Sequence, residues 1–170
     1  MKTVVCAGLF AIFFAASPCA LGAAPLDELG RFEGTWKSQG TFVKTPYSDP
    51  GSSSASTTCT WSGDRLFMLC QQVVSMAGQR DDDLGIYTYD ETADSYRFFN
   101  IHPAHVTTTL ITVYGDTITY PFSFTDKGKN VTIRTLNVWK KASFYTWRTD
   151  YTTDGGKTWT PMASGTSQRQ

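Results

Sequence analysis

The sequence has little net charge, few histidines and few cysteines, and each of these scarcities excludes something. The 15 Lys and Arg residues balance the 15 Asp and Glu residues, and the basic residues are scattered along the chain. Nucleic acids and anionic membrane surfaces are normally bound through a concentrated basic patch, so neither is expected as a partner. Only two histidines are present, and no Gly-x-Ser-x-Gly turn offers a nucleophile for a catalytic triad.

Long apolar runs are also missing, apart from one at the N-terminus. Lys2 precedes an apolar run from Val4 to Ala16, and small residues follow as far as Gly22. This run is too short to span a bilayer comfortably and is typical of an export signal. The alternative is a buried N-terminal helix. We expect residues 1–22 to be a cleaved signal peptide, residues 25–170 to form one domain without a membrane span, and the mature protein to be secreted or periplasmic.

Removal of such a signal leaves two of the four cysteines. Cys59 and Cys70 flank the segment Trp61–Arg65, which reads as the turn of a β-hairpin, so the two thiols should face each other across it. An oxidising compartment favours a structural disulfide between them. The alternative is two free buried thiols. A metal site would need further ligands nearby, and none is evident, so we expect no metal and no cofactor.

What the sequence has in abundance is strand chemistry. Thr, Tyr, Val and Phe recur, and apolar and polar residues alternate strictly, as in the segment Thr117–Phe124, with turn residues every eight to twelve positions. This pattern predicts an all-β antiparallel up-and-down meander of about ten strands, most simply closed into a barrel. Leu26–Leu29 should form one helical turn. We expect a loop at Tyr47–Ser56, a turn at Ala77–Asp83, and an irregular or unpaired stretch at Pro121.

The first expected strand carries a family resemblance. Phe32-x-Gly34-x-Trp36-Lys37 resembles the opening strand of the calycins, the group of lipocalins and fatty-acid-binding proteins. Together with Gly85–Asp90 and Asp154–Trp159, it also resembles an uncharacterised family of secreted bacterial lipocalin-like domains. The resemblance implies a barrel able to hold one small ligand, with Arg169 packed over the Trp36 ring. Trp36 would close the barrel floor or, alternatively, contact the ligand.

Two further expected strands carry the remaining candidate ligand-binding residues. A register that sets Arg134 opposite Trp147, with Tyr145 on the same face, would give a cation–π contact. If that face points inward, Arg134 could receive an anionic head group, as arginines do in fatty-acid-binding barrels. If it points outward, the two residues form a surface pair. The sequence leaves both possibilities open.

Three other motifs have plain structural interpretations. Thr152–Trp159 fits the Asp-box pattern, which we interpret as a hairpin turn and not as a carbohydrate site. His102 and His105 are expected in an exposed turn, with haem ligation by one of them as the alternative. Asp81–Asp83 lacks the spacing of a calcium loop and should be a solvated turn.

Three functions compete on this basis. The favoured one is a secreted or periplasmic barrel that binds a small apolar, amphipathic or anionic amphipathic ligand. The second is an enzyme, a hydrolase or an isomerase, with an acid–base pair inside the barrel. The third is a protein whose outer surface makes interactions and whose interior is filled. A buried carboxylate near a histidine at the barrel mouth would favour the second.

Overall fold

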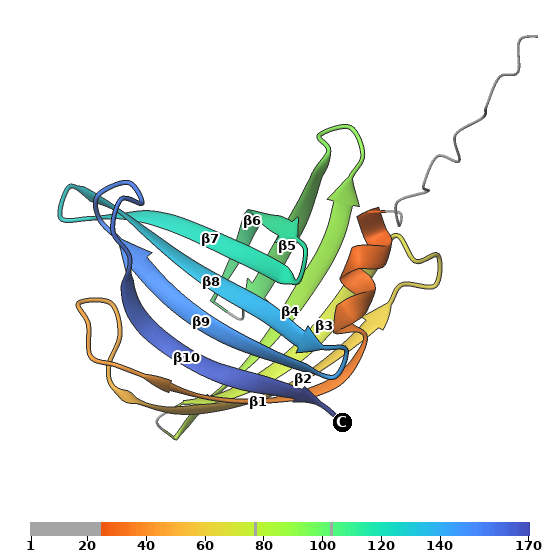
Figure 1. Cartoon of the computed structure of the whole chain (residues 1–170), viewed down its shortest axis with the longest axis horizontal. Coiled ribbons are helices and arrows are strands. Elements are labelled where there is room, and N and C mark those ends of the chain that lie inside the picture. Colours follow the sequence, from red (N-terminus) through yellow and green to blue (C-terminus); the bar gives the residue numbers. More distant parts are fainter. Residues whose placement is uncertain (1–24, 77, 103) are drawn as a thin grey trace, which may run out of the picture.

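The protein is an antiparallel β-barrel closed at one end by a short helix (Figure 1). The computed structural model describes residues 25–76, 78–102 and 104–170. The expected export signal, residues 1–22, lies outside the described residues. After the 3₁₀ helix η1 (Pro25–Phe32), the strands are β1 (Gly34–Phe42), β2 (Gly51–Trp61), β3 (Phe67–Met76), β4 (Gln79–Asp90), β5 (Ser95–His102), β6 (His105–Tyr114), β7 (Thr117–Asp126), β8 (Lys129–Lys141), β9 (Phe144–Thr152) and β10 (Thr160–Arg169).

The strand order confirms the predicted meander. Each strand pairs with its neighbours in the sequence, and β1 also pairs with β10, from Trp36 opposite Arg169 to Phe42 opposite Ala163. This last ladder closes the sheet into a barrel, so the first and last strands have no free edge.

Two expectations about the ends of strands were wrong. Residues Gly51–Ser56 of the segment expected as a loop belong to β2: all of them are paired with β1, and Ser53–Ser56 are also paired with β3. Gln79–Asp83, expected in a turn, belongs to β4. In both segments hydrogen bonds to neighbouring strands outweigh a local composition that is typical of loops.

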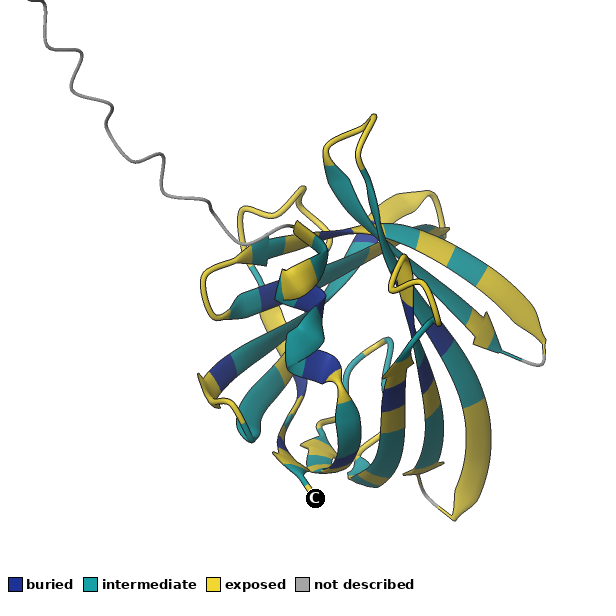
Figure 2. Cartoon of the chain, turned by 90° about the vertical axis from the view of Figure 1, so that its right-hand side faces the viewer, coloured by how far each residue is buried: buried dark blue, intermediate teal, exposed yellow. Residues whose placement is uncertain are grey.

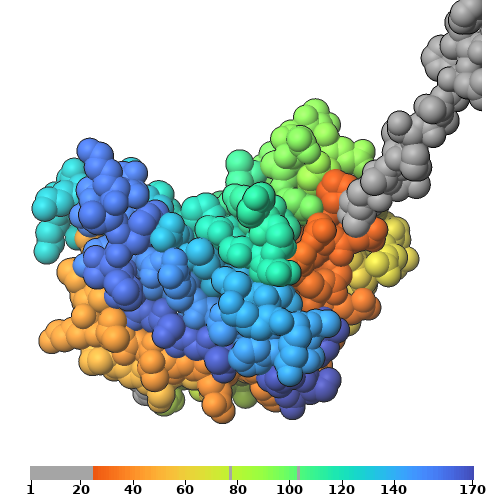
Figure 3. All heavy atoms as spheres, in the orientation of Figure 1, coloured from red at the N-terminus to blue at the C-terminus, as the bar shows by residue number. Residues whose placement is uncertain are grey.

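The irregularity expected at Pro121 is present, and it lies between β6 and β7. These strands share only three residue pairs, ending at Thr112 opposite Thr119, whereas β7 and β8 stay paired past Pro121. Proline has no N–H to donate to β6, and the two strands diverge beyond this point. In the space-filling view, residues of β6 lie between those of β7 and those of β4 (Figure 3).

Helix η1 lies at the end of the barrel where β1 begins, as Figure 2 shows. Leu29 and Phe32 are buried there, and Phe32 stacks on Tyr87 with ring centres 4.9 Å apart. The buried residues around them are Cys59, Met68, Cys70, Ile111, Ile118 and Trp139. Apolar burial at this end holds the helix in place and leaves the opposite end of the barrel free to form a cavity.

The predicted disulfide joins Cys59 and Cys70, which pair directly across the β2–β3 hairpin. Both half-cystines are buried, so the bridge belongs to the core that η1 covers. Within the described residues, no helix has the length and apolar character needed to cross a membrane.

Candidate functional site

The interior of the barrel holds a cavity of about 420 Å³ on the side away from η1. Phe98, Tyr120 and Tyr145 form its floor, since each of them also packs against the buried core. Sixteen residues line it: Ser38, Phe42, Ser53, Ser54, Ala55, Gln72, Val74, Met76, Phe98, Asn100, Tyr120, Thr135, Asn137, Tyr145, Trp147 and Thr149. A cavity of this size accommodates a small organic molecule.

Among the described residues, no Asp, Glu, Lys, Arg or His side chain lines this cavity. Its polar groups are hydroxyls and side-chain amides. Burial raises the pKa of Tyr145 above its usual value, and burial together with the nearby Tyr87 phenol raises that of Tyr120 well above it. Both phenols therefore stay protonated at neutral pH and can donate hydrogen bonds. The lining is thus polar and aromatic but uncharged.

Trp147 forms one wall of the cavity, and two glycines make room for it. A Cβ atom on Gly40 would lie 2.2 Å from the indole, and one on Gly165 would lie 2.5 Å from it. Gly165 is directly opposite Trp147 in the β9–β10 ladder, and Gly40 is opposite Gly165 in the β1–β10 ladder. Glycine at both positions lets the indole lie against the backbone of β10 and β1.

The structure brings together only some of the predicted ligand-binding residues. Tyr145 and Trp147 line the cavity, and Trp36 does not. Trp36 is 1% exposed and donates its Nε1 hydrogen to the Phe32 carbonyl at 2.8 Å, below the cavity floor. The guanidinium carbon of Arg169 lies 4.8 Å from the centre of the Trp36 ring, as the calycin resemblance implied.

The register expected for Arg134 was wrong. Arg134 is opposite Asp150, and Trp147 is opposite Asn137. The chain reverses at Ala142 and Ser143, after a bulge near Lys140, which is later than the sequence pattern indicated. Since Thr135 and Asn137 line the cavity, alternation along β8 places Arg134 on the outer face of the barrel.

On that outer face Arg134 has its own partners. Its Nη2 lies 3.3 Å from Asp150 Oδ2, and its guanidinium carbon lies 3.7 Å from the Trp159 ring centre. Trp159 ends the Asp-box segment, where Asp154 accepts hydrogen bonds from the Thr158 backbone at 3.0 Å and hydroxyl at 2.6 Å. These bonds lower the Asp154 pKa well below its usual range. The segment is the hairpin connection expected, and it holds Arg134 away from the cavity.

Both histidines stand beside the mouth of the cavity. They face each other at the β5–β6 turn with stacked rings whose centres are 4.8 Å apart. His102 Nε2 lies 3.8 Å from Asp81 Oδ1 and 4.0 Å from Asp83 Oδ1. Burial raises the pKa of the Asp83 carboxyl, and the nearby His102 opposes the shift. A carboxylate and a histidine are therefore adjacent. Asp83 is paired with the cavity residue Gln72, and His102 lies two residues after the cavity residue Asn100 on β5, so both lie close to the cavity lining.

Sequence reasoning missed the three amides of the cavity, Gln72, Asn100 and Asn137. Strand alternation was the available signal, because Asn100 shares a face with Phe98 and Asn137 shares one with Thr135. That signal identifies shared faces but does not say which face is interior. For this reason the amides could be grouped with their neighbours but not placed in a cavity.

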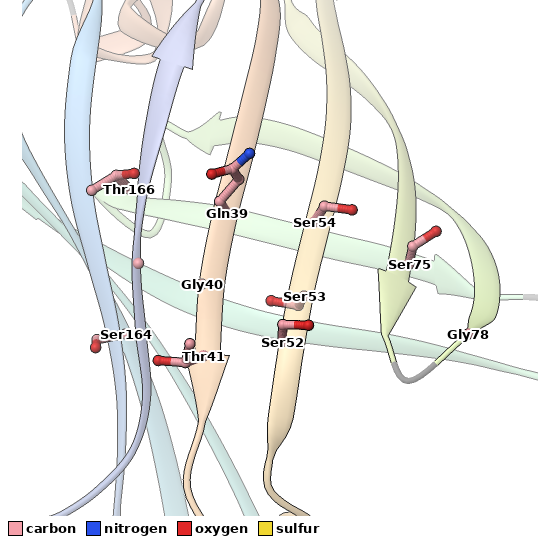
Figure 4. Close-up of a pocket in the computed structure, with 11 residues that line it drawn as sticks. Gln39, Gly40, Thr41, Ser52, Ser53, Ser54, Ser75, Gly78, Ser164 and Thr166 are labelled. Carbon is pink, nitrogen blue, oxygen red and sulfur yellow. The ribbon is translucent and has the colours of Figure 1, made fainter.

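A larger groove, about 680 Å³, lies on the outside of the barrel over β1, β2 and β10 (Figure 4). Its side chains are small and polar, among them Gln39, Thr41, Ser52 and Thr166. Gln39 and Thr41 flank Gly40, which faces Trp147 inside, so their side chains project outward. The described residues that line the groove include no aromatic ring, and the interior cavity is therefore the better candidate site.

Solved structures share this fold. Rv2717c from M. tuberculosis matches with a TM-score of 0.58 at 16% identity, covering 86% of this chain and 98% of its own. The S-type phycobiliprotein lyase CPES from Guillardia theta matches with a TM-score of 0.56 at 11% identity, covering 85% and 91%. A structure of EF1p2_mFAP2b bound to DFHBI matches at 15% identity, covering 86% and 100%, with a TM-score of 0.46.

These likenesses concern the fold alone. No protein-family model matches the sequence, and no curated protein matches it either. The closed ten-strand antiparallel barrel and its structural neighbours fit a calycin-like fold, and no family is assigned on that evidence.

Proposed function

We propose that this protein is a small-molecule-binding barrel whose ligand occupies the interior cavity. The observation that carries the proposal is the cavity of about 420 Å³ lined by aromatic rings, hydroxyls and amides. Natural binding pockets combine a mainly apolar wall with a few polar groups that orient the ligand. Phe42, Phe98 and Trp147 supply such a wall, and Asn100 and Asn137 supply such polar groups.

The proposal rests on this chain's own cavity and not on the functions of its structural neighbours. One neighbour is named a phycobiliprotein lyase, and a calycin-like barrel can serve unrelated roles. A barrel packed solid would have no room for a ligand. Here the floor residues Phe98, Tyr120 and Tyr145 stop short of the mouth, and the space above them is the proposed binding site.

Tryptophan fluorescence tests the proposal. Trp147 is the one tryptophan that lines the cavity within the described residues, so a bound apolar molecule should quench its emission saturably. Trp147→Phe should abolish most of this quenching. Ala55→Phe should fill the cavity and prevent binding, while Thr60→Phe, at an exposed position on the same strand, should leave binding intact. Equal quenching in wild type and Ala55→Phe would contradict binding in the cavity.

One observation favours a second candidate, an acid–base enzyme at the mouth. His102 Nδ1 accepts the Ala104 backbone N–H at 3.2 Å, so the neutral ring carries its proton on Nε2, facing Asp81 and Asp83. This arrangement could transfer protons to or from a molecule in the mouth. The test is hydrolysis of p-nitrophenyl acetate by wild type and by His102→Gln. A wild-type rate equal to that of the variant would eliminate this candidate.

Export is the remaining part of the proposal. The expected signal, residues 1–22, would direct the chain to a compartment that oxidises thiols, and the Cys59–Cys70 disulfide is compatible with such a compartment. Mass spectrometry of the protein recovered from its native host should find an N-terminus at Ala23. Recovery of the protein with Met1 still attached would contradict cleavage.

A further inference from the structure

We infer that the ligand of the interior cavity is an uncharged molecule with a flat aromatic ring and with both hydrogen-bond donors and acceptors. This inference rests on the proposed function and narrows the class of ligand. Three properties of the cavity carry it: the charge of its lining, the placement of its aromatic rings, and the hydrogen-bonding groups that remain available.

The lack of charge in the lining disfavours an ionic group inside the cavity. None of the sixteen lining residues carries a formal charge at neutral pH. A buried carboxylate or ammonium group without a partner of opposite charge has a large unfavourable desolvation energy. Arg134, the cation expected for an anionic head group, is held on the outer face by Asp150 and Trp159. A fatty-acid carboxylate would therefore have no counter-charge among the lining residues.

The aromatic rings suit a flat ligand. Trp147 has the glycine-lined backbone of β1 and β10 on one side and lines the cavity with its exposed surface. Phe42 lies beside it, with ring centres 6.5 Å apart. Phe98 and Tyr120 form an edge-to-face pair on the floor, with ring centres 5.5 Å apart. A ring lying between these groups gains stacking contacts that an aliphatic chain does not.

The amides supply complementary hydrogen bonds. Gln72 uses its Nε2 to donate to Thr57 Oγ1 at 2.8 Å, which leaves its side-chain carbonyl free to accept. Asn100 adds a second amide to the lining, and a side-chain amide can both donate and accept. Since an amide buried by a ligand must find new partners, the ligand should carry a donor and an acceptor, as a phenol or an aromatic amide does.

Two fluorescent probes that differ by one charge test this inference. N-phenyl-1-naphthylamine is neutral, and 8-anilino-1-naphthalenesulfonate has the same ring framework with an added sulfonate. We expect the neutral probe to bind wild type at least about tenfold more tightly, because the sulfonate meets no cation in the cavity. Only the binding that Ala55→Phe abolishes is counted, which excludes probe molecules on the outer surface.

The possible outcomes separate the two proposals. Equal or tighter binding of the sulfonate in the cavity would overturn the uncharged ligand and leave the binding function standing. Failure of both probes to bind in the cavity would count against the binding function itself. Preference for the neutral probe supports both.

A charge inserted into the cavity provides the matched control. Asn137→Lys should reverse the preference toward the sulfonate, while Thr166→Lys, which adds the same charge on the outer face, should not. If Asn137→Lys does not fold, the ratio of the two affinities in wild type decides the question by itself. A reversal produced equally by Thr166→Lys would show that the preference reflects the outer surface, and it would overturn the inference.

Discussion

Arg169, on the last strand, packs over Trp36, on the first, and its guanidinium carbon lies 4.8 Å from the centre of the indole ring. Arg169 also donates to the Arg31 carbonyl from Nη2 at 2.8 Å, and Trp36 donates to the Phe32 carbonyl. The two side chains thus join β1, β10 and the end of helix η1. This contact closes the barrel at the end opposite the cavity mouth.

We predict that Arg169→Ala lowers the free energy of unfolding by about 1–3 kcal/mol, through loss of the cation–π contact and the hydrogen bond. Urea denaturation measures the change. Arg169→Lys keeps the charge but not the planar group, and it should recover only part of the loss. A stability unchanged by Arg169→Ala would show that the strand pairing of β1 and β10 closes the barrel without help from this contact.

Removal of the Cys59–Cys70 disulfide should be costly, although the loop that it closes is short. The double variant Cys59→Ala/Cys70→Ala should lose about 2–3 kcal/mol of stability, because the unfolded chain regains conformational freedom. The check is a comparison of urea midpoints for wild type, the reduced wild type and the double variant. The reduced protein and the variant should both unfold earlier than the oxidised protein, and coincident midpoints for all three would contradict the prediction.

The close approach of the Trp147 indole to the backbone at Gly40 predicts that Gly40→Ala is destabilising. The added methyl group would lie 2.2 Å from the indole and 2.7 Å from the Ser164 carbonyl, so the ring must move into the cavity. Such overpacking typically costs about 1–3 kcal/mol. Ligand-induced quenching should weaken as well. In a Trp147→Ala background the same substitution should cost less, and a double-mutant cycle without any coupling would refute the contact.

The buried tyrosines predict a loss of stability at alkaline pH. Burial raises the pKa of Tyr120 and Tyr145 above the usual value of 10.0. Between that value and the raised pKa, the folded state therefore holds protons that the unfolded state has lost. Stability is unaffected by these groups below pH 10 and falls as the pH rises above it. Tyr120→Phe should make this fall shallower.

Absorbance at 295 nm, recorded together with near-ultraviolet circular dichroism, tests the alkaline prediction. Part of the rise in absorbance at 295 nm, which reports ionised tyrosine, should appear only at the pH where the near-ultraviolet circular dichroism of the folded protein is lost. Complete ionisation of all eight tyrosines in a protein that keeps its tertiary signal would show that the cavity floor is open to solvent.

Arg134 should matter for stability and not for ligand binding. Arg134→Ala removes the contacts to Asp150 and Trp159 and should cost about 1–3 kcal/mol. Arg148 also lies 3.3 Å from Asp150, but its side chain is 58% exposed, so Arg148→Ala should cost less than about 1 kcal/mol. Neither change should alter the affinity for N-phenyl-1-naphthylamine. A weaker affinity in Arg134→Ala alone would place Arg134 in contact with the ligand after all.

Local chemistry was sufficient to predict the class of fold. The alternation along segments such as Thr117–Phe124, and the turns between them, depend on each residue and its near neighbours in the chain. The hairpin that pairs Cys59 with Cys70 is equally local, since eleven positions separate the two cysteines. The export signal at residues 1–22 stays a prediction, because it lies outside the described residues.

Register depended on details that composition does not reveal. Because the chain reverses at Ala142 and Ser143, with a bulge near Lys140, Arg134 is paired with Asp150 and not with Trp147 as the sequence pattern had suggested. Ser53–Ser56 belong to β2 because they are paired with β1 on one side and with β3 on the other. A register slip changes every cross-strand partner, and turn residues of similar composition permit several registers.

The sequence by itself determined a meander of strands, its disulfide and the tryptophan strand that opens it. Only the tertiary structure decided which face of each strand is interior. Along β6 the face that carries Val106, Leu110 and Tyr114 points outward, and these residues are 65%, 53% and 84% exposed, whereas Ile111 is 4% exposed. An alternating pattern is the same whichever way the sheet curls. The curl is fixed by contacts between distant residues, such as Trp147 against Gly40, and those contacts also create the uncharged cavity.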